Sequence, residues 1–460
     1  MSGSFEELDV PPTLVSFAVA PGKAERVISP EFKAAGNAVA WFPADPLGDS
    51  QGFLAMLDAV EAAVAAGEIR SAWTVGRGGI AEALFKMALG NRIGAEIDGL
   101  CTEELFAPAR CGIVAELSAE TAPRGGRVIG RTTDSFTLTV KGERASLELV
   151  RQVYENRLEP VFPHRTAPGA PSEEEIPCVR FCAGKKLSPA VKTARPRALI
   201  PVFPGTNCEY DTARALRRAG AEPVVMVVGN LTPQAVSDSI RTMERLIGES
   251  QMIVLPGGFS GGDEPDGSAK LIAAFFRNPR ISDAVHRLLQ DRDGLMLGIC
   301  NGFQALIKLG LVPYGRILDT DANCPTLTFN TIGRHQSMLV RTRICSDLSP
   351  WLSKCAPGEL HTVAVSHGEG RFVAPPELAR KLAEAGQIAA QYVDAEGKPT
   401  MDLRYNPNGS LFAVEAITSP DGRVLGKMGH SERSGKNLYK NVPGNAFQPI
   451  FEGGVSYFRD

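Results

Sequence analysis

The chain has 460 residues, of which 43% are hydrophobic and 22% charged, and its formal net charge at neutral pH is −3. A chain of this length is expected to form about three domains with substantial cores. The pI near 6.2 provides no basic field for nucleic acid, and no apolar run approaches the roughly 20 residues that span a membrane.

Nine cysteines are scattered through the sequence without a Cys-x-x-Cys pair. An odd number without regular spacing predicts reduced thiols in a cytoplasmic chain rather than a disulfide scaffold. The N-terminus has no signal-peptide pattern, and the sequence predicts no metal site.

Residues 1–160 have the pattern of an α+β unit. Residues 12–19 are strand-like, and apolar side chains recur at helical spacing over 51–67. Residues 71–80 predict a strand that passes through a glycine turn into a helix over 81–88. Such a turn can cradle phosphate with the free N–H groups of the first helical turn, although glycines at turns more often serve backbone geometry.

The composition changes between residues 158 and 197, where seven prolines accompany a Ser-Glu-Glu-Glu run. Prolines break helices and remove donors from sheet ladders. Residues 161–195 are therefore predicted to form a linker that lies over the surface, in which 178–192 is a candidate wedge between domains.

Residues 196–460 begin with short apolar runs that alternate with helical stretches. The helices are expected from 209 to 218 and from 236 to 247, and the apolar runs are 197–203, 224–228, 252–255 and 295–297. This alternation predicts a parallel, doubly wound sheet, whose ligands bind beyond the carboxyl ends of the strands.

Cys300 follows the last of these runs, between Gly298 and Gly302. The two glycines predict a sharp strand-to-helix turn, with the positive end of the next helix directed at the sulfur. That environment favours the nucleophilic thiolate, whereas most free cysteines are simply buried thiols. Cys208 is a second candidate nucleophile, but it lacks the flanking glycines.

A thiolate nucleophile needs an imidazole within hydrogen-bond reach and a carboxylate that orients the imidazole. The sequence offers two His-x-Glu pairs, His367 with Glu369 and His430 with Glu432. Alternate residues on a strand or loop can cooperate, so composition alone leaves both pairs open. The second pair follows a predicted strand over 423–428.

Residues 298–304, Gly-Ile-Cys-Asn-Gly-Phe-Gln, resemble the nucleophile motif of class I (triad-type) glutamine amidotransferases. Residues 367–372, His-Gly-Glu-Gly-Arg-Phe, together with 327–335, further resemble the glutaminase domain of the phosphoribosylformylglycinamidine synthase family. This resemblance is strong over 196–440 and implies a flavodoxin-like fold. It also implies that His367 belongs to a loop that faces the synthetase domains.

The resemblance implies roles for particular residues. Cys300 is expected to be the nucleophile, His430 the base and Glu432 the group that orients it, while His335 and His361 are ordinary histidines. The glutamine and its oxyanion are expected to contact Gly257, Gly258, Phe259, Asn301 and Gln304, because consecutive glycines free backbone N–H groups. A plain tight turn is the alternative for the two glycines.

Two departures from the family pattern stand out. The family usually places proline on both sides of the catalytic histidine, whereas this chain has Gly429 and Ser431, which predicts a looser backbone. An aromatic residue and an arginine usually follow the oxyanion strand, whereas residues 261–268 contain only glycine, proline, serine and acidic residues. The rim of the glutamine pocket is therefore undefined by the resemblance.

The N-terminal unit resembles the C-terminal half of the aminoimidazole-ribonucleotide-synthetase-like fold. Residues 105–106, 111–114, 129–132 and 136–140 fit the later strands of that fold. Active copies carry an Asp-x-Ser-Asp-Gly-Gly-like turn, but residues 74–79 have neither carboxylate, and magnesium needs hard oxygen ligands. This chain is expected to hold no cofactor, and ATP and Mg²⁺ are expected in a synthetase region outside it.

The sequence therefore predicts an enzyme that hydrolyses L-glutamine and supplies ammonia for the ATP-dependent conversion of formylglycinamide ribonucleotide to formylglycinamidine ribonucleotide in purine biosynthesis. Its expected partner is the remaining synthetase region, in the same chain or a separate one. Two alternatives are another flavodoxin-like cysteine hydrolase or chaperone, and a non-catalytic module that completes an assembly.

Overall fold

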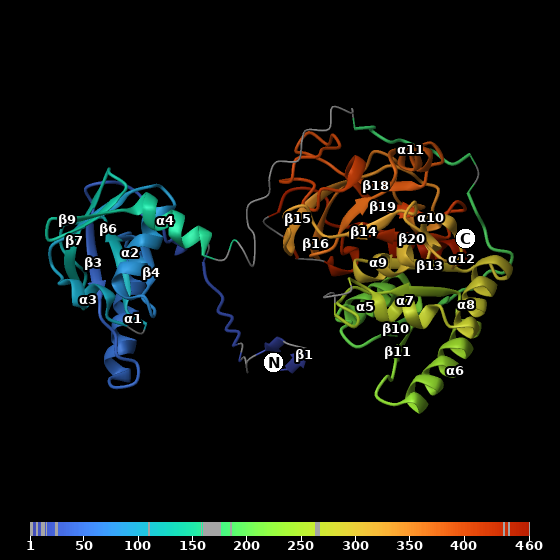
Figure 1. Cartoon of the computed structure of the whole chain (residues 1–460), viewed down its shortest axis with the longest axis horizontal. Coiled ribbons are helices and arrows are strands. Elements are labelled where there is room, and N and C mark those ends of the chain that lie inside the picture. Colours follow the sequence, from blue (N-terminus) through green and yellow to red (C-terminus); the bar gives the residue numbers. More distant parts are fainter. Residues whose placement is uncertain are drawn as a thin grey trace. The chain divides into compact units, whose positions relative to one another are not determined.

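The structure is a computed structural model that describes residues 3–459 except 6, 7, 11–13, 15, 24, 25, 109, 110, 158, 160–175, 185, 263–266, 436, 437, 440 and 441. The chain divides into two compact units, Met1–Pro160 and Val161–Asp460 (Figure 1). Among the described residues, no helix is both long and apolar enough to cross a bilayer.

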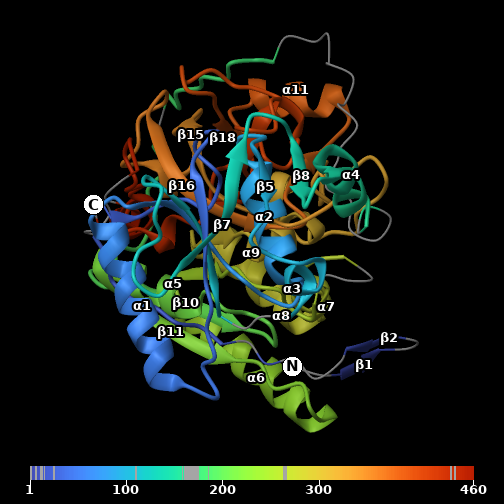
Figure 2. The ribbon, with the colours of Figure 1, turned by 90° about the vertical axis from the view of Figure 1, so that its left-hand side faces the viewer.

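The first unit is built on a seven-stranded sheet with the order β4-β6-β3-β7-β5-β8-β9. Its strands are β3 (Ala38–Phe42), β4 (Ile69–Thr74), β5 (Gly94–Ile97), β6 (Ile113–Leu117), β7 (Arg127–Thr133), β8 (Thr137–Val140) and β9 (Glu143–Ser146). Its helices are α1 (Ser50–Ala65), α2 (Gly79–Leu89), α3 (Thr102–Phe106) and α4 (Leu147–Asn156). Two short strands, β1 (Gly3–Phe5) and β2 (Leu8–Val10), pair with each other side by side (Figure 2).

Alternation along β3 explains why helices cover both faces of this sheet. Val39 and Trp41 belong to the core that also contains the buried residues of α2. Ala40 and Phe42 belong to a second core, which contains the buried residues of α1. Successive side chains of a strand point to opposite faces, so one central strand supports two cores.

Two predictions about this unit are wrong. Residues 105–106 lie in helix α3 rather than in a strand, because Glu104 accepts a hydrogen bond from the Cys101 N–H at 2.8 Å and caps the helix. The predicted strand over 12–19 has no regular structure at its described residues, 14 and 16–19, and the rest of it lies outside the described residues.

The glycine turn before α2 has a steric reason. A Cβ atom at Gly79, whose φ is +69°, would collide with the carbonyl oxygen of Leu105. The N–H of Gly78 donates to a carboxylate oxygen of Glu82 at 3.0 Å. A side chain of the same helix therefore already uses an N–H group that a phosphate would need.

The second unit contains a nine-stranded sheet with the order β11-β10-β12-β13-β20-β19-β18-β15-β16. The first five strands in this order are parallel, and the last four continue the sheet in antiparallel pairs. The parallel strands are β10 (Arg197–Val202), β11 (Glu222–Val227), β12 (Met252–Leu255), β13 (Leu295–Ile299) and β20 (Val424–Lys427). The remaining four are β15 (Gln336–Ile344), β16 (Leu360–His367), β18 (Ile388–Tyr392) and β19 (Val414–Thr418).

The predicted parallel sheet is thus present, with an antiparallel extension that the sequence pattern did not predict. Every residue of β12 and β13 is buried, as expected for parallel strands that are covered on both faces. The helices of this unit are α5 (Glu209–Ala219), α6 (Pro233–Glu249), α7 (Lys270–Phe276), α8 (Pro279–His286), α9 (Asn301–Lys308), α10 (Leu311–Tyr314), α11 (Pro376–Glu384) and α12 (Ile450–Arg459).

Residues 327–335 do not form the single strand of the family pattern. Strand β14 (Thr326–Thr328) ends early and pairs with β17 (Arg371–Val373). A turn with Gly333 at a φ of +71° follows before β15 begins. Residues 411–413, directly before β19, form a 3₁₀ turn in which Phe412 has a φ of +52°.

The described part of the proline-rich segment, 176–195 without 185, packs along the second unit. Val179 is buried in its core, and the Phe181 N–H donates to the Cys345 carbonyl at 2.8 Å. Residues 160–175, which carry four of the seven prolines, lie outside the described residues.

Candidate active site

Cys300 occupies a strained turn between β13 and α9. Its φ is +52° and its ψ is −107°, a conformation that few residues other than glycine adopt. A Cβ atom at Gly298 would lie 2.6 Å from the backbone of Gly302, and one at Gly302 would collide with the Leu255 carbonyl. The two glycines therefore allow the close packing that holds the thiol beyond the carboxyl end of the strand.

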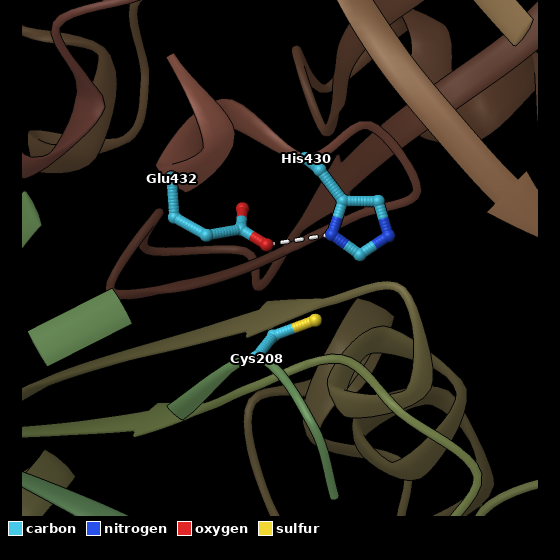
Figure 3. A group of neighbouring side chains, drawn as sticks. All are labelled: Cys208, His430 and Glu432. Atoms are coloured by element: carbon cyan, nitrogen blue, oxygen red, sulfur yellow. Dashed lines mark hydrogen bonds and ion pairs between the residues drawn. The ribbon is translucent and has the colours of Figure 1, made fainter. Parts of the chain in front are cut away.

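His430 and Glu432 follow strand β20, the parallel neighbour of β13. The Nδ1 atom of His430 lies 2.6 Å from the Oε1 atom of Glu432, and both side chains are buried (Figure 3). The Cys300 N–H donates to the Lys427 carbonyl at 2.8 Å. Pairing of β13 with β20 thus brings the ends of both strands, and the side chains beyond them, to one edge of the sheet.

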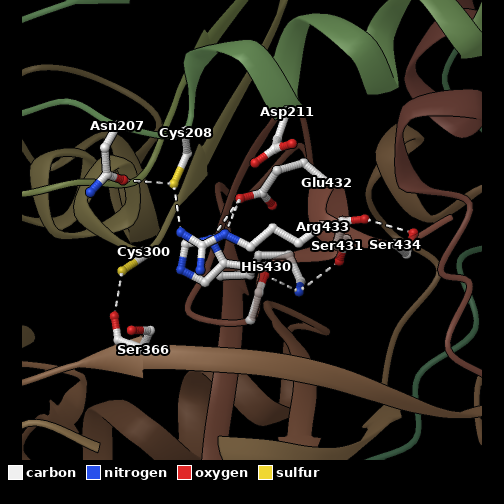
Figure 4. Close-up of polar contacts among 12 residues, drawn as sticks. Asn207, Cys208, Asp211, Cys300, Ser366, His430, Ser431, Glu432, Arg433 and Ser434 are labelled. Carbon is white, nitrogen blue, oxygen red and sulfur yellow. Dashed lines mark hydrogen bonds and ion pairs between the residues drawn. The ribbon is translucent and has the colours of Figure 1, made fainter. Parts of the chain in front are cut away.

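Gly257 marks the point where these groups meet. A Cβ atom there would lie 2.8 Å from Cε1 of His430, 3.1 Å from Sγ of Cys208 and 3.5 Å from Cβ of Cys300. The thiol of Cys300 is 95% buried and lies 3.6 Å from the Ser366 carbonyl (Figure 4). The Nε2 atom of His430 is buried without a hydrogen-bond partner among the described residues, so it is available to a reacting group.

The charges of this cluster support one another. Burial opposes the imidazolium form of His430, but attraction by Glu432 and Cys300 outweighs burial and raises the pKa of His430 well above its usual value. Burial likewise disfavours the Glu432 carboxylate, and His430 outweighs it and lowers the pKa of Glu432. The pair is therefore suited to hold a proton on the imidazole while the carboxylate stays charged.

Hydrogen bonds fix the backbone around His430 without the usual prolines. The His430 N–H donates to the Ala364 carbonyl at 2.8 Å, and the Gly429 N–H donates to Oε1 of Glu415 at 2.7 Å. The buried Lys427 ammonium donates to the Gly429 carbonyl at 2.6 Å and to the Ser431 hydroxyl at 3.0 Å. Buried polar groups therefore hold this backbone at the positions where the family usually has prolines.

The second His-x-Glu pair has a different geometry. Nδ1 of His367 lies 3.2 Å from Oδ1 of Asn330, an amide that carries no charge. Glu369 instead accepts a hydrogen bond from the Ser268 N–H at 3.1 Å. Burial, with the nearby charges of His430 and His335, lowers the pKa of His367 to about 3. A histidine that resists protonation and lacks a carboxylate partner is poorly suited to be the base.

The residues predicted to bind glutamine fall into two groups. Asn301 and Gln304 are buried and connect backbone segments. The Ser260 N–H donates to Oδ1 of Asn301 at 3.2 Å, and Nδ2 of Asn301 donates to Oε1 of Gln304 at 2.9 Å. The Gln304 amide in turn donates to the Glu369 carbonyl. Their side chains hold the site together rather than face a substrate.

The glycine loop lies closer to the reacting groups. Gly258 has a φ of +141°, and a Cβ atom there would lie 2.6 Å from the Gly205 carbonyl. The N–H of the half-exposed Phe259 donates to that same carbonyl at 2.8 Å, so this N–H is already in use. The N–H of Asn301, in the first turn of α9, has no acceptor within its own helix.

Sequence reasoning missed a contact between Cys208 and Arg433. The Arg433 guanidinium donates to Sγ of Cys208 at 2.9 Å, and that thiol lies 3.0 Å from Oδ1 of Asn207 (Figure 4). Ligand atoms of Cys208, His430 and Glu432 lie within 4.8 Å of one another, a spacing that a metal ion could use. The guanidinium of Arg433 already supplies a positive charge there. The only sequence feature that indicates this contact is the position of Arg433 directly after Glu432.

A strained cysteine beyond a parallel strand, near a buried His–Glu pair, has the residue types of a cysteine-dependent catalytic triad. Residues 195–458 match the family model described as a CobB/CobQ-like glutamine amidotransferase domain. The chain therefore belongs to this family of glutamine amidotransferases.

Comparison with individual proteins identifies more specific relatives within this family. The chain is 36% identical over 257 residues to the phosphoribosylformylglycinamidine synthase subunit PurQ of Chlorobium chlorochromatii, covering 55% of this chain and 94% of the relative. It is 34% identical over 245 residues to the PurQ subunit of Symbiobacterium thermophilum, covering 53% of this chain and 91% of the relative. A solved structure of PurLQS from Thermotoga maritima matches 58% of this chain and 100% of its own with a TM-score of 0.42 and 24% identity.

Proposed function

We propose that the chain is the glutaminase part of a phosphoribosylformylglycinamidine synthase, which hydrolyses glutamine and delivers the ammonia for purine biosynthesis. The observation that carries the proposal is the cluster of Cys300, His430 and Glu432 at one edge of the sheet, in a domain that matches glutamine amidotransferases. The PurQ names of the relatives supply the reaction that the ammonia serves.

The triad accounts for both halves of the hydrolysis. The Cys300 sulfur attacks the side-chain carbonyl carbon of glutamine, and the thiol proton resides on Nε2 of His430. The tetrahedral intermediate expels ammonia, which takes that proton from His430. A water molecule then gives a proton to His430 and cleaves the γ-glutamyl thioester to glutamate.

Backbone donors stabilise the oxyanion of each tetrahedral intermediate. The N–H groups of Gly258 and Asn301 border the strained turn at Cys300, on the glycine loop and in the first turn of α9. Donors held by the fold need no reorganisation as negative charge develops. Glu432 stabilises the imidazolium at the same moment.

The remaining steps belong to a synthetase region outside this chain. Residues 1–160 form the C-terminal half of a synthetase-like module, residues 161–195 connect it to the glutaminase domain, and that domain spans 196–460. The turn at 74–79 has no carboxylate that could hold magnesium, so the ATP and Mg²⁺ that activate formylglycinamide ribonucleotide bind in the missing region. The nine free cysteines fit a reducing, cytoplasmic location.

Two assays test this function. Cys300→Ser should abolish glutamate release from glutamine and labelling by glutamine-analogue electrophiles, while Cys208→Ser, the matched control, should retain labelling. The purified chain alone should show weak glutaminase activity and form no formylglycinamidine ribonucleotide from ATP, formylglycinamide ribonucleotide and ammonium. Adding the synthetase region should restore synthesis and raise glutamine turnover. Synthesis by the chain alone, or loss of labelling in Cys208→Ser only, would contradict the proposal.

A further inference from the structure

A second cluster of metal-ligating side chains lies outside the triad, where β16 begins. Cys355 follows a short 3₁₀ turn, Glu359 precedes β16 and His361 is its second residue. One ligand atom from each of the three lies within 4.8 Å of the others. Thiolate, imidazole and carboxylate together are a ligand set that suits zinc rather than magnesium or calcium.

The histidine of this cluster lacks the partners that a buried imidazole needs. His361 is 99% buried, and neither ring nitrogen has a hydrogen-bond partner among the described residues. Its Nε2 atom lies 3.1 Å from Oε1 of Glu359, but the contact does not have hydrogen-bond geometry. Buried polar atoms are almost always satisfied, so an unsatisfied imidazole next to a thiol and a carboxylate indicates a missing partner.

The surroundings favour a cation as that partner. Glu415, whose Oε2 atom is buried without a hydrogen-bond partner among the described residues, acts electrostatically on His361, and Glu452 acts on Cys355. Lys427 is the positive group that acts on both, and it is already paired with Glu415 at 3.3 Å. The groups named here include three carboxylates, those of Glu359, Glu415 and Glu452, and one ammonium group, that of Lys427.

Comparison with the cluster at Cys208 shows why the two sites differ. In that cluster the thiol accepts from the Arg433 guanidinium and the imidazole is bonded to Glu432 at 2.6 Å, so the thiol and the imidazole each have a polar partner. At the Cys355 cluster, by contrast, neither ring nitrogen of His361 has a hydrogen-bond partner among the described residues.

We propose that Cys355, Glu359 and His361 form a binding site for a borderline divalent cation, with Zn²⁺ the natural candidate. Bond lengths of about 2.0 Å to nitrogen and about 2.3 Å to sulfur place tetrahedral ligands roughly 3.5 Å apart, so metal binding would draw these three side chains closer together. Glu359 is about one-third exposed, so the ion has access from solvent and a water molecule completes its coordination. The bound ion ties the loop after the 3₁₀ turn to the start of β16.

Cobalt is a direct probe, because a thiolate bound to Co²⁺ gives a charge-transfer absorption that free cobalt lacks. The metal-free full chain is titrated with Co²⁺ and then with Zn²⁺. We expect one Co²⁺ per chain with this absorption, its displacement by Zn²⁺, and a Zn²⁺-dependent rise in the melting temperature. Absence of the absorption at stoichiometric cobalt overturns the proposal.

Variants locate the ion. Cys355→Ser should remove the absorption, whereas Cys345→Ser, which changes another fully buried thiol, should retain it. Glu359→Gln changes a partly exposed side chain that should not prevent folding, and it should weaken cobalt binding about tenfold or more. Loss of the absorption in Cys208→Ser with retention in Cys355→Ser would place the ion at the triad instead and refute the site. An unchanged affinity in Glu359→Gln would also contradict it, even if Cys355→Ser did not fold.

Discussion

Replacing Glu432 by glutamine isolates the contribution of one buried charge to catalysis. Oε1 of Glu432 lies 2.6 Å from Nδ1 of His430, and neither side chain is exposed to solvent. Glutamine keeps the size of the side chain but removes the charge that stabilises the imidazolium. Its amide N–H₂ group can also donate to Nδ1 of His430. The imidazole proton then stays on Nε2, and a protonated Nε2 cannot accept the proton of the thiol.

Loss of a comparable orienting carboxylate or general base lowers kcat by about 10²- to 10⁴-fold. This corresponds to roughly 3–5 kcal/mol of transition-state stabilisation, at 1.36 kcal/mol for each factor of ten. The assay is glutamate release from glutamine at saturating substrate, with circular dichroism to verify the fold. KM should change little, because the carboxylate faces the imidazole rather than the substrate.

Glu369→Gln is the matched control, because it makes the same change in the other His-x-Glu pair. Glu369 is equally buried but accepts from the Ser268 N–H instead of contacting a histidine. We expect its kcat to fall less than tenfold. If Glu369→Gln lost more activity than Glu432→Gln, the orienting role would belong to the first pair and our reasoning about the site would be wrong.

The remaining predictions use stability and sterics as well as rate. The pKa of Glu432 is lowered in the folded state and that of His430 is raised. The difference in unfolding free energy between the wild type and Glu432→Gln should therefore become smaller as pH falls below about 4.5, and again at alkaline pH. Chemical denaturation across pH measures this difference, and a constant value would contradict the prediction. His430→Ala should lower glutaminase activity about 10²-fold or more and His367→Ala much less, and the reverse ranking would exchange their roles. Gly257→Ala should lower kcat at least about tenfold, because its Cβ atom would lie 2.8 Å from the His430 ring. The control Gly248→Ala has open space around the new Cβ atom and should leave kcat nearly unchanged. Equal effects of the two substitutions would refute the steric argument.

The strained turn at Cys300 could be predicted from sequence because its signal is local. Gly298 and Gly302 flank Cys300 at fixed offsets after an apolar strand, and the structure shows the strained turn that this spacing implies. The parallel strands were predictable for the same reason, since strands buried on both faces have continuous apolar runs. The short helix at 102–106 was not predictable in this way, because five residues are too few to show helical periodicity and its acidic first turn is a weak signal.

Composition alone could not decide which histidine is the candidate base. His367 with Glu369 and His430 with Glu432 have the same spacing, and only the resemblance to a family separated them in the sequence. In the structure the difference is direct: one imidazole bonds a carboxylate at 2.6 Å, and the other lies 3.2 Å from an amide oxygen.

The sequence by itself thus determined the strained turn at Cys300 and the apolar strands, because glycine conformation and hydrophobic periodicity act over a few neighbouring residues. Only the tertiary structure decided which side chains meet. Cys208 and Arg433 are 225 positions apart, yet the guanidinium and the thiol are 2.9 Å apart. Their contact depends on the order in which strands pair in the sheet. That order is set by packing between distant segments, which leaves no pattern in either local stretch.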